Sequence, residues 1–167
     1  MSAVDDVLER NREYVEGFRD GDAPMSPRLP LVVLSCLDAR VQPARFLALG
    51  VGEAHVIRNA GGRATDDALR SIIVSTQLLG TCECMVIHHT DCGMQTFTND
   101  EVRQRLRAKT GVSADDIDFM PFDDLEASAQ EDVRTIRANP LLPKHLDVTA
   151  WIYDVETGKL DEVKVLD

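Results

Sequence analysis

Short apolar runs alternate with longer amphipathic stretches along the chain. Residues 31–34 are apolar throughout, which is typical of a strand buried on both faces, and residues 54–57 and 84–87 are further short strands. Apolar residues at helical spacing and capping residues such as Thr65 predict helices, which cover residues 4–18, 43–49, 66–79, 100–109 and 124–138. Two alternating stretches on either side of residues 156–159 predict a hairpin over residues 149–155 and 160–165.

This order of strands and helices predicts an α/β fold with a mainly parallel central β-sheet flanked by helices and a C-terminal hairpin. If the first strand lies between the second and third, the topological switch point lies between residues 31–34 and 84–87. Cys36 follows the first of these strands, whereas His89 and Cys92 follow the other. Because such sheets bind ligands at the carboxyl ends of their strands, we expect these three side chains to converge.

Cysteine and neutral histidine are ligand types that zinc prefers, and three protein ligands with an open fourth position are typical of a catalytic zinc site. Cys36, His89 and Cys92 make up such a set. Asp38 and Arg40 stand two and four residues after Cys36, and they are the groups expected to orient a metal-bound water. The structural alternatives are a buried core thiol at Cys36 and an ordinary surface ion pair between Asp38 and Arg40.

Other cysteines and histidines are expected to have structural roles. Cys84 lies on the third predicted strand about 16 Å before His89, at roughly 3.3 Å per residue, so Cys82 and Cys84 are too far away to share its ion. His88 points to the opposite face from His89 if the strand reaches both, and the spacing to Cys92 favours His89 as the ligand. The remaining histidines, His55 and His145, lack a partner pattern.

The charge balance argues against nucleic-acid and anionic-membrane partners, because 18 basic and 29 acidic residues give a net charge of −11. The length of 167 residues predicts one domain over residues 1–167. No apolar run approaches the roughly 18 residues that span a bilayer, and the amino terminus carries no signal-peptide pattern. We therefore expect a cytoplasmic protein whose four cysteines are reduced.

The two motifs, Cys-x-Asp-x-Arg and His-x-x-Cys, make the chain resemble the β-class carbonic anhydrases, and the resemblance extends through residues 52–62 between them. It is similar to the short actinobacterial-type branch of that class, which also includes carbonyl sulfide hydrolases. The resemblance implies one Zn²⁺ ion per subunit on Cys36, His89 and Cys92, with Asp38 and Arg40 as the catalytic pair. It also implies a homodimer or a dimer of dimers, in which a helical arm of residues 1–20 packs on the partner subunit.

Three functions remain open. The leading one is reversible hydration of CO₂ to bicarbonate and a proton through a zinc-bound hydroxide. The second is hydrolysis of carbonyl sulfide to CO₂ and H₂S by the same site, and the third is a non-enzymatic zinc-binding regulatory protein. No glutamine precedes the first strand and Met94 follows Gly93, both departures from the better-known plant-type pattern that leave the substrate preference open.

The charge of the ligand set makes Asp38 and Arg40 important for the expected reaction. Two thiolates cancel the +2 charge of zinc, so a bound water should be harder to ionise than on a site with three histidines. Asp38 is expected to compensate by accepting a hydrogen bond from the hydroxide, while Arg40 holds it as an ion pair. Release by Arg40 would let Asp38 become the fourth ligand, which predicts loss of activity as the pH falls.

Overall fold

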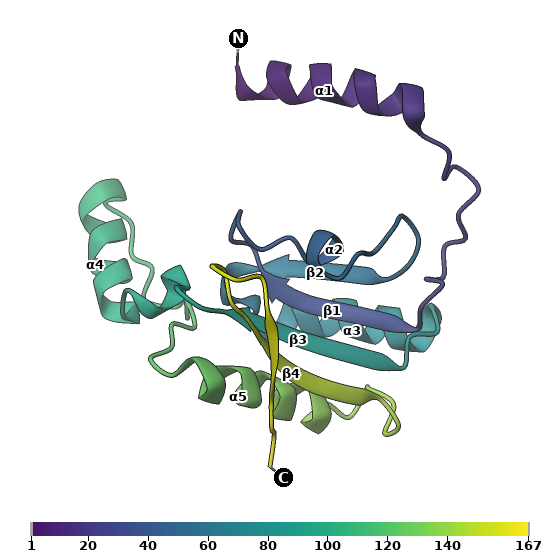
Figure 1. Ribbon diagram of the computed structural model, residues 1–167. Helices are drawn as coiled ribbons and strands as arrows, with labels where there is room; N and C mark the ends of the chain where they lie inside the picture. Colours follow the sequence, from purple (N-terminus) through teal and green to yellow (C-terminus); the bar gives the residue numbers. More distant parts are fainter. Residues whose placement is uncertain (1, 167) are drawn as a thin grey trace.

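The central element of the computed structural model, which describes residues 2–166, is a five-stranded sheet with the order β2-β1-β3-β4-β5 (Figure 1). The strands are β1 (Leu31–Cys36), β2 (His55–Asn59), β3 (Glu83–His89), β4 (Asp147–Tyr153) and β5 (Leu160–Val163). Strands β1 to β4 run parallel, whereas β5 pairs antiparallel with β4. The predicted parallel sheet with a C-terminal hairpin is therefore confirmed, and β1 lies between β2 and β3 as expected.

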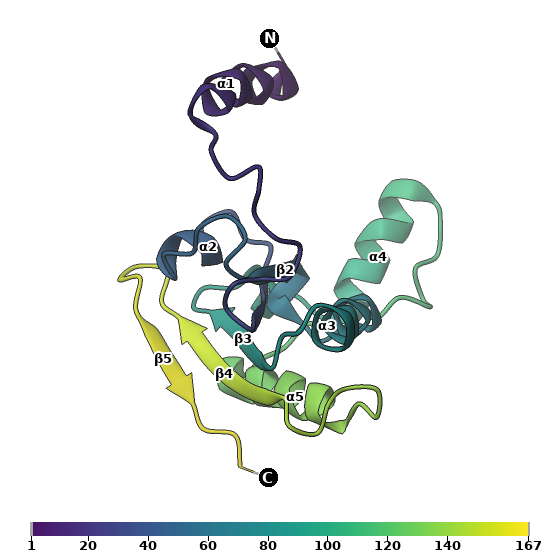
Figure 2. The same cartoon turned by 90° about the vertical axis from the view of Figure 1, so that its right-hand side faces the viewer.

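The helices are α1 (Ala3–Gly17), α2 (Pro43–Phe46), α3 (Asp66–Leu78), α4 (Asn99–Thr110) and α5 (Leu125–Ala138), with short 3₁₀ turns η1 (Ala60–Gly62) and η2 (Gly93–Gln95). Helices α3 and α5 cover one face of the sheet, whereas α2 lies over the other (Figure 2). The predicted helix over residues 43–49 is too long, because Ala48 adopts a left-handed backbone with φ 52°. Thr65 caps α3 as predicted, since its hydroxyl accepts a hydrogen bond from the amide of Ala68.

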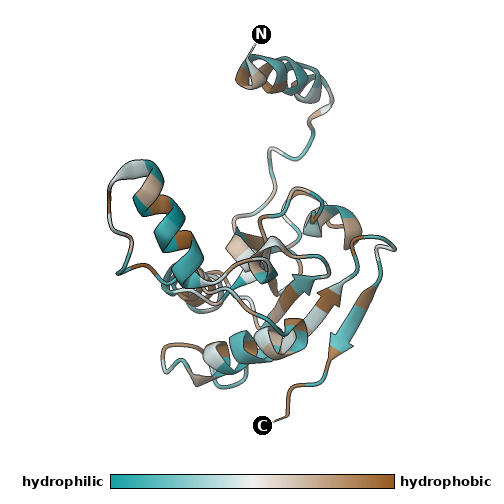
Figure 3. Ribbon diagram, turned by 90° about the vertical axis from the view of Figure 1, so that its left-hand side faces the viewer, coloured by the Kyte–Doolittle hydropathy of each residue, from teal (hydrophilic) through white to brown (hydrophobic). Residues whose placement is uncertain are grey.

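The main core lies between the sheet and the helices α3 and α5. Alternate residues of β1, β3 and β4 point to it, because side chains of a strand alternate between its two faces. The central strands are accordingly rich in apolar residues, whereas the edge strand β5 is largely polar (Figure 3). The buried members from the sheet are Val32, Leu34, Cys84, Val86, Val148 and Ala150, and those from the helices are Ala68, Ile72, Ala129, Val133 and Ile136. Val33 and Ser35, which point to the other face, are buried as well, so β1 is buried on both faces as its sequence predicts.

Helix α1 lies apart from the sheet and its covering helices (Figures 1 and 2). None of its residues is buried, although it carries several apolar side chains: Val4, Val7, Leu8, Tyr14 and Val15. Among residues 2–166, no helix has both the length and the apolar character needed to cross a bilayer.

Candidate metal centre

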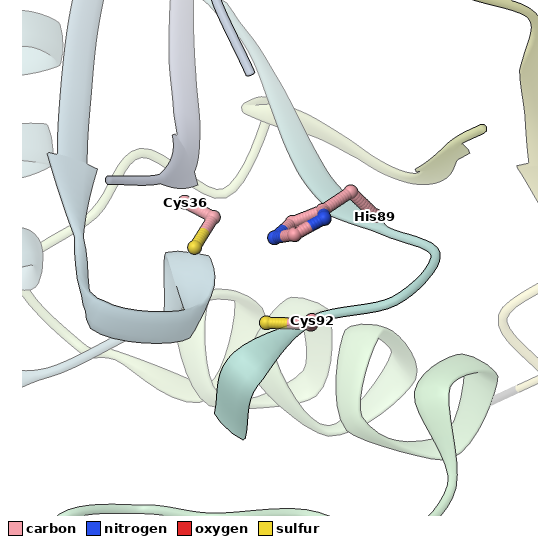
Figure 4. A group of neighbouring side chains, drawn as sticks. All are labelled: Cys36, His89 and Cys92. Atoms are coloured by element: carbon pink, nitrogen blue, oxygen red, sulfur yellow. The ribbon is translucent and has the colours of Figure 1, made fainter. Parts of the chain in front are cut away.

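Cys36, His89 and Cys92 come together at the carboxyl edge of the sheet (Figure 4). Cys36 ends β1 and His89 ends the neighbouring parallel strand β3, while Cys92 follows one turn later. Their ligand atoms, two Sγ atoms and one imidazole nitrogen, all lie within 4.8 Å of one another, and all three residues are buried. The expected convergence of these side chains therefore occurs in the structure.

The imidazole of His89 presents an unused lone pair to the two sulfur atoms. Its Nδ1 lies 2.9 Å from the carbonyl oxygen of Thr90, and because a carbonyl only accepts, Nδ1 carries the proton. Nε2 is then an acceptor, and within the described part of the chain it is buried without a hydrogen-bond partner. Such an atom is costly unless something occupies its lone pair. A metal ion held between Nε2 and the two sulfurs would satisfy it.

The two thiols shift each other's pKa in opposite directions. The hydrogen bond from Cys92 is the largest cause that lowers the pKa of Cys36, and it outweighs the effect of burial; the backbone amide of Asp38 also donates to the Cys36 sulfur at 3.4 Å. The resulting thiolate in turn raises the pKa of Cys92 well above its ordinary value. A divalent cation would replace the shared proton and stabilise both thiolates. One imidazole and two thiolates therefore fit Zn²⁺.

Arg40 holds Asp38 beside this cluster through a bidentate ion pair. Nε and Nη2 of Arg40 donate to Oδ1 and Oδ2 of Asp38 at 3.1 and 2.8 Å, and the Arg40 amide donates to Oδ1 at 2.8 Å. The Arg40 side chain, as the largest cause, holds the pKa of the Asp38 carboxyl well below its usual range. Asp38 is therefore an ionised acceptor with a fixed orientation.

Arg40 also binds Asp91, which the sequence analysis missed. Nη1 of Arg40 donates to Oδ2 of Asp91 at 2.7 Å, and Nη2 donates to its carbonyl oxygen at 2.9 Å. One guanidinium thus joins the segment after β1 to the segment after β3. The position of Asp91 directly before Cys92 was the available sequence signal, but its link to Arg40 depends on the pairing of the two strands.

Arg58 has a structural role beside the site. Its Nε donates to the carbonyl oxygen of Cys36 at 2.9 Å, and its Nη2 donates to that of Asp38 at 2.7 Å. These bonds fix the backbone of the first motif from the neighbouring strand β2. The thiols of Cys36 and Cys92 pack in an apolar cluster with Met94, Phe97, Phe122 and Leu125.

The remaining cysteines and histidines lie outside the metal cluster, as expected. Cys84 is part of the main core, where burial raises the pKa of its thiol to about 12. His88 points away from His89 toward α5, and His55 pairs with the hydroxyl of Ser75 at 2.7 Å. Cys82 is partly buried and His145 is exposed.

Gly61 and Gly62 form one wall of the site by close backbone approach. Both have left-handed backbone, with φ of 80° and 70°. A Cβ on Gly62 would lie 3.0 Å from the amide nitrogen of Cys36 and from the carbonyl carbon of Ser35. Both atoms belong to the β1 backbone and have little freedom to move.

Gly62→Ala is therefore expected to lower the free energy of unfolding by about 1–3 kcal/mol through backbone strain, with the clash against β1 adding to it. Gly111→Ala is the control, because Gly111 has a similar φ of 74° but no heavy atom within 4 Å of the added Cβ. Urea unfolding of both variants measures the difference. Equal losses in the two variants would contradict the close-approach argument.

Comparison with known proteins places this site in a family. Residues 31–160 match the family model described as carbonic anhydrase. The chain is 41% identical over 165 residues to Beta-carbonic anhydrase 1 of Mycobacterium tuberculosis (98% of this chain, 99% of the relative). It is 35% identical over 181 residues to a carbon disulfide hydrolase of Saccharolobus solfataricus (94% and 87%). A crystal structure of carbonic anhydrase from Streptococcus mutans matches with a TM-score of 0.95 and 43% identity (98% and 99%). The chain therefore belongs to the β-carbonic anhydrase family.

Proposed function

We propose that this protein catalyses the reversible hydration of CO₂ to bicarbonate and a proton with one zinc ion per subunit. The observation that carries the proposal is the buried cluster of Cys36, His89 and Cys92 beside a carboxylate that Arg40 holds in place. The membership of the β-carbonic anhydrase family supports the same reaction.

Cys36, His89 and Cys92 would hold the zinc ion and leave one coordination position open. When bound, the ion would lower the pKa of a water molecule at that position toward neutrality. Asp38 would accept a hydrogen bond there and orient the attacking lone pair toward the CO₂ carbon. Arg40 would keep Asp38 in this orientation and away from the ligand atoms, since it engages both carboxylate oxygens. The apolar side chains of Met94 and Phe122 beside the thiols suit a small apolar substrate.

A second candidate is hydrolysis of a sulfur analogue of CO₂ by the same site. The sequence resemblance points to carbonyl sulfide, and a relative at 35% identity is named as a carbon disulfide hydrolase. Both molecules present an electrophilic carbon to the same nucleophile, so the shape of the pocket, and not the ligand set, would decide between the substrates.

Parallel assays of the zinc-loaded protein test these functions. CO₂ hydration is followed by a pH indicator, and hydrolysis of carbonyl sulfide and of carbon disulfide by release of H₂S. We expect CO₂ hydration to have the highest kcat/KM of the three. Faster release of H₂S would favour the second candidate, and zinc-bound protein without any of these activities would favour the regulatory function.

Activity is expected to decline as the pH falls below neutrality, and protonation of Asp38 is not the cause. Arg40 holds the pKa of Asp38 well below its usual range, so the carboxylate stays ionised in weak acid. The loss would follow when Arg40 releases Asp38 and the carboxylate takes the open coordination position. The measurement is kcat/KM from about pH 6 to pH 9, on either side of the pKa near 7 of a catalytic zinc water, with crystal structures at both ends. Asp38 paired with Arg40 at every pH would contradict this gating.

The assembly that we propose is a homodimer or a dimer of dimers in the cytoplasm, built from one domain over residues 1–167. The exposed apolar side chains of α1 support packing of residues 1–20 on a partner subunit, because an isolated helix of this length is marginal in water.

A further inference from the structure

A buried polar network next to the metal cluster connects three parts of the chain: β3, the segment after η1, and α5. Its members are Arg63, His88, Ser128 and Asp132, which are between 0% and 4% exposed. None of them has a role in the proposed chemistry. Buried charged groups are costly, and apolar side chains of similar size often replace them without loss of stability. The network therefore calls for an explanation other than stability.

Asp132 of α5 is the centre of this network, because its carboxylate bridges two segments of the chain. Oδ2 lies 3.0 Å from Nε2 of His88 and 2.9 Å from Nε of Arg63. Oδ1 accepts a hydrogen bond of 2.9 Å from the backbone amide of Ala64. One side chain thus holds both the end of β3 and the segment that follows η1.

On the β3 side, Asp132 contacts His88, which directly precedes the proposed ligand His89. Nδ1 of His88 lies 2.9 Å from Oγ of Ser128, and that hydroxyl donates to the carbonyl oxygen of Leu125 at 2.9 Å. The His88 ring also stacks on Phe122 at a centroid distance of 5.5 Å. Because both ring nitrogens and one ring face have partners, the peptide that joins His88 to His89 has a fixed orientation. Adjacent side chains of a strand point to opposite faces, so this orientation also sets the direction of His89.

On the other side, Arg63 and Ala64 directly follow the two glycines of the site wall. The Asn59 side chain pairs with the backbone of Arg63 at 2.8 and 2.7 Å and closes the turn that contains both glycines. This turn lies directly against the end of β1, since a Cβ added to Gly62 would be 3.0 Å from the amide nitrogen of Cys36. The ion pair of Asp132 with Arg63 and its hydrogen bond from the Ala64 amide therefore hold the turn that packs against the backbone of Cys36.

We infer that Asp132 is a positioning residue of the metal site, which orients His89 through His88 and holds the glycine turn against Cys36 through Arg63 and Ala64. The inference rests on the proposed function, since it takes Cys36 and His89 to be metal ligands. Groups that orient metal ligands from outside the coordination sphere affect metal affinity and activity by about 10-fold to 100-fold.

The test is Asp132→Asn, which keeps the size of the side chain and removes its charge. The neutral amide loses the ion pair with Arg63, and its single oxygen cannot replace both carboxylate oxygens toward His88 and Ala64, so both held segments loosen. We expect zinc affinity, measured by competition with a chelator, to fall by about 10-fold. We also expect the d–d absorption of the Co²⁺-substituted protein to change, because it reports the geometry of the ligand atoms.

Ile136→Val is the matched control for a general loss of stability. Ile136 lies one turn further along α5, is fully buried in the main core, and has an apolar side chain that cannot join the hydrogen bonds of the polar network. The control should lower the melting temperature and leave zinc affinity and the Co²⁺ spectrum unchanged. If it changes both as much as Asp132→Asn does, the effect of Asp132 is merely structural and the inference is wrong.

Ser128→Ala provides a second, milder test that remains available if Asp132→Asn does not fold. It removes the partner of Nδ1 of His88 and leaves Asp132 in place, so a smaller change in the same direction is expected. The double variant should be non-additive, because both residues act on the same ring. If Asp132→Asn or Ser128→Ala keeps the zinc affinity and the Co²⁺ spectrum of the wild type, the inference about Asp132 is wrong, but the proposed function is not affected. A wild-type protein that binds no zinc would overturn the proposed function as well.

Discussion

Cys92→Ala is expected to remove zinc from the protein and to reduce CO₂ hydration by at least about a thousandfold. A catalytic zinc lowers the pKa of a bound water from about 15.7 to about 7, so loss of the ion removes the nucleophile that works at neutral pH. Cys36 and His89 alone leave two ligands, which is fewer than catalytic zinc sites use. Zinc content by mass spectrometry and CO₂ hydration by stopped flow measure the two effects.

Cys84→Ala is the matched control, since Cys84 is equally buried but belongs to the main core. It removes one sulfur atom from apolar surroundings and should cost about 1 kcal/mol of stability, with zinc content unchanged. Zinc retained in Cys92→Ala, or lost in Cys84→Ala, would refute the assignment of the ligands.

Asp38→Ala is expected to reduce kcat/KM by about 100-fold or more while zinc content stays the same. Zinc stays because the three ligand atoms come from other residues. The rate falls because a side chain that positions a proton or a nucleophile contributes about 10²–10⁴-fold. The loss should appear mainly in kcat, since Asp38 would act on the attacking group and not on the binding of CO₂. Steady-state kinetics of the zinc-loaded variant measure it.

Asp91→Ala distinguishes the contributions of Asp38 and Asp91, the two carboxylates that Arg40 binds. Asp91 is 77% exposed at its side chain, and exposed ion pairs contribute about 0–1 kcal/mol, so this variant should keep most of the activity. Arg40 would still engage both oxygens of Asp38. Equal losses in Asp38→Ala and Asp91→Ala would mean that Asp38 serves only to hold Arg40. Loss of zinc in Asp38→Ala would mean that Asp38 is itself a ligand.

The fold was largely predictable because its elements differ in local pattern. The buried strand β1 is a continuous apolar run, and α3 combines an N-cap, acidic residues in its first turn and a regular apolar face. The boundary of α2 was not predictable, because the left-handed conformation of Ala48 has no signal in an apolar, helix-favouring segment. Tertiary packing, and not helix propensity, ends this helix.

The metal cluster was predictable to a greater extent than its surroundings. Cys36, His89 and Cys92 stand at fixed distances from two recognisable strands, so the topology rule for parallel sheets brings them together. Asp132 and Phe122 were not predictable, because they belong to α5 and to the loop before it, which are far from both motifs along the chain. No spacing rule relates a helix of one face to a ligand at the end of a particular strand.

Local pattern alone was enough to identify the strands, the ligand types and their order, because each depends on residues within a few positions of one another. Only the tertiary structure shows that Arg40 joins both motifs through Asp91, and that Asp132 bonds to both His88 and Ala64. The physical reason is that a hydrogen bond depends on distance and angle to within fractions of an ångström. That precision arises only when strands and helices pack against one another, so the sequence predicts that Cys36, His89 and Cys92 cluster but not which groups hydrogen-bond around them.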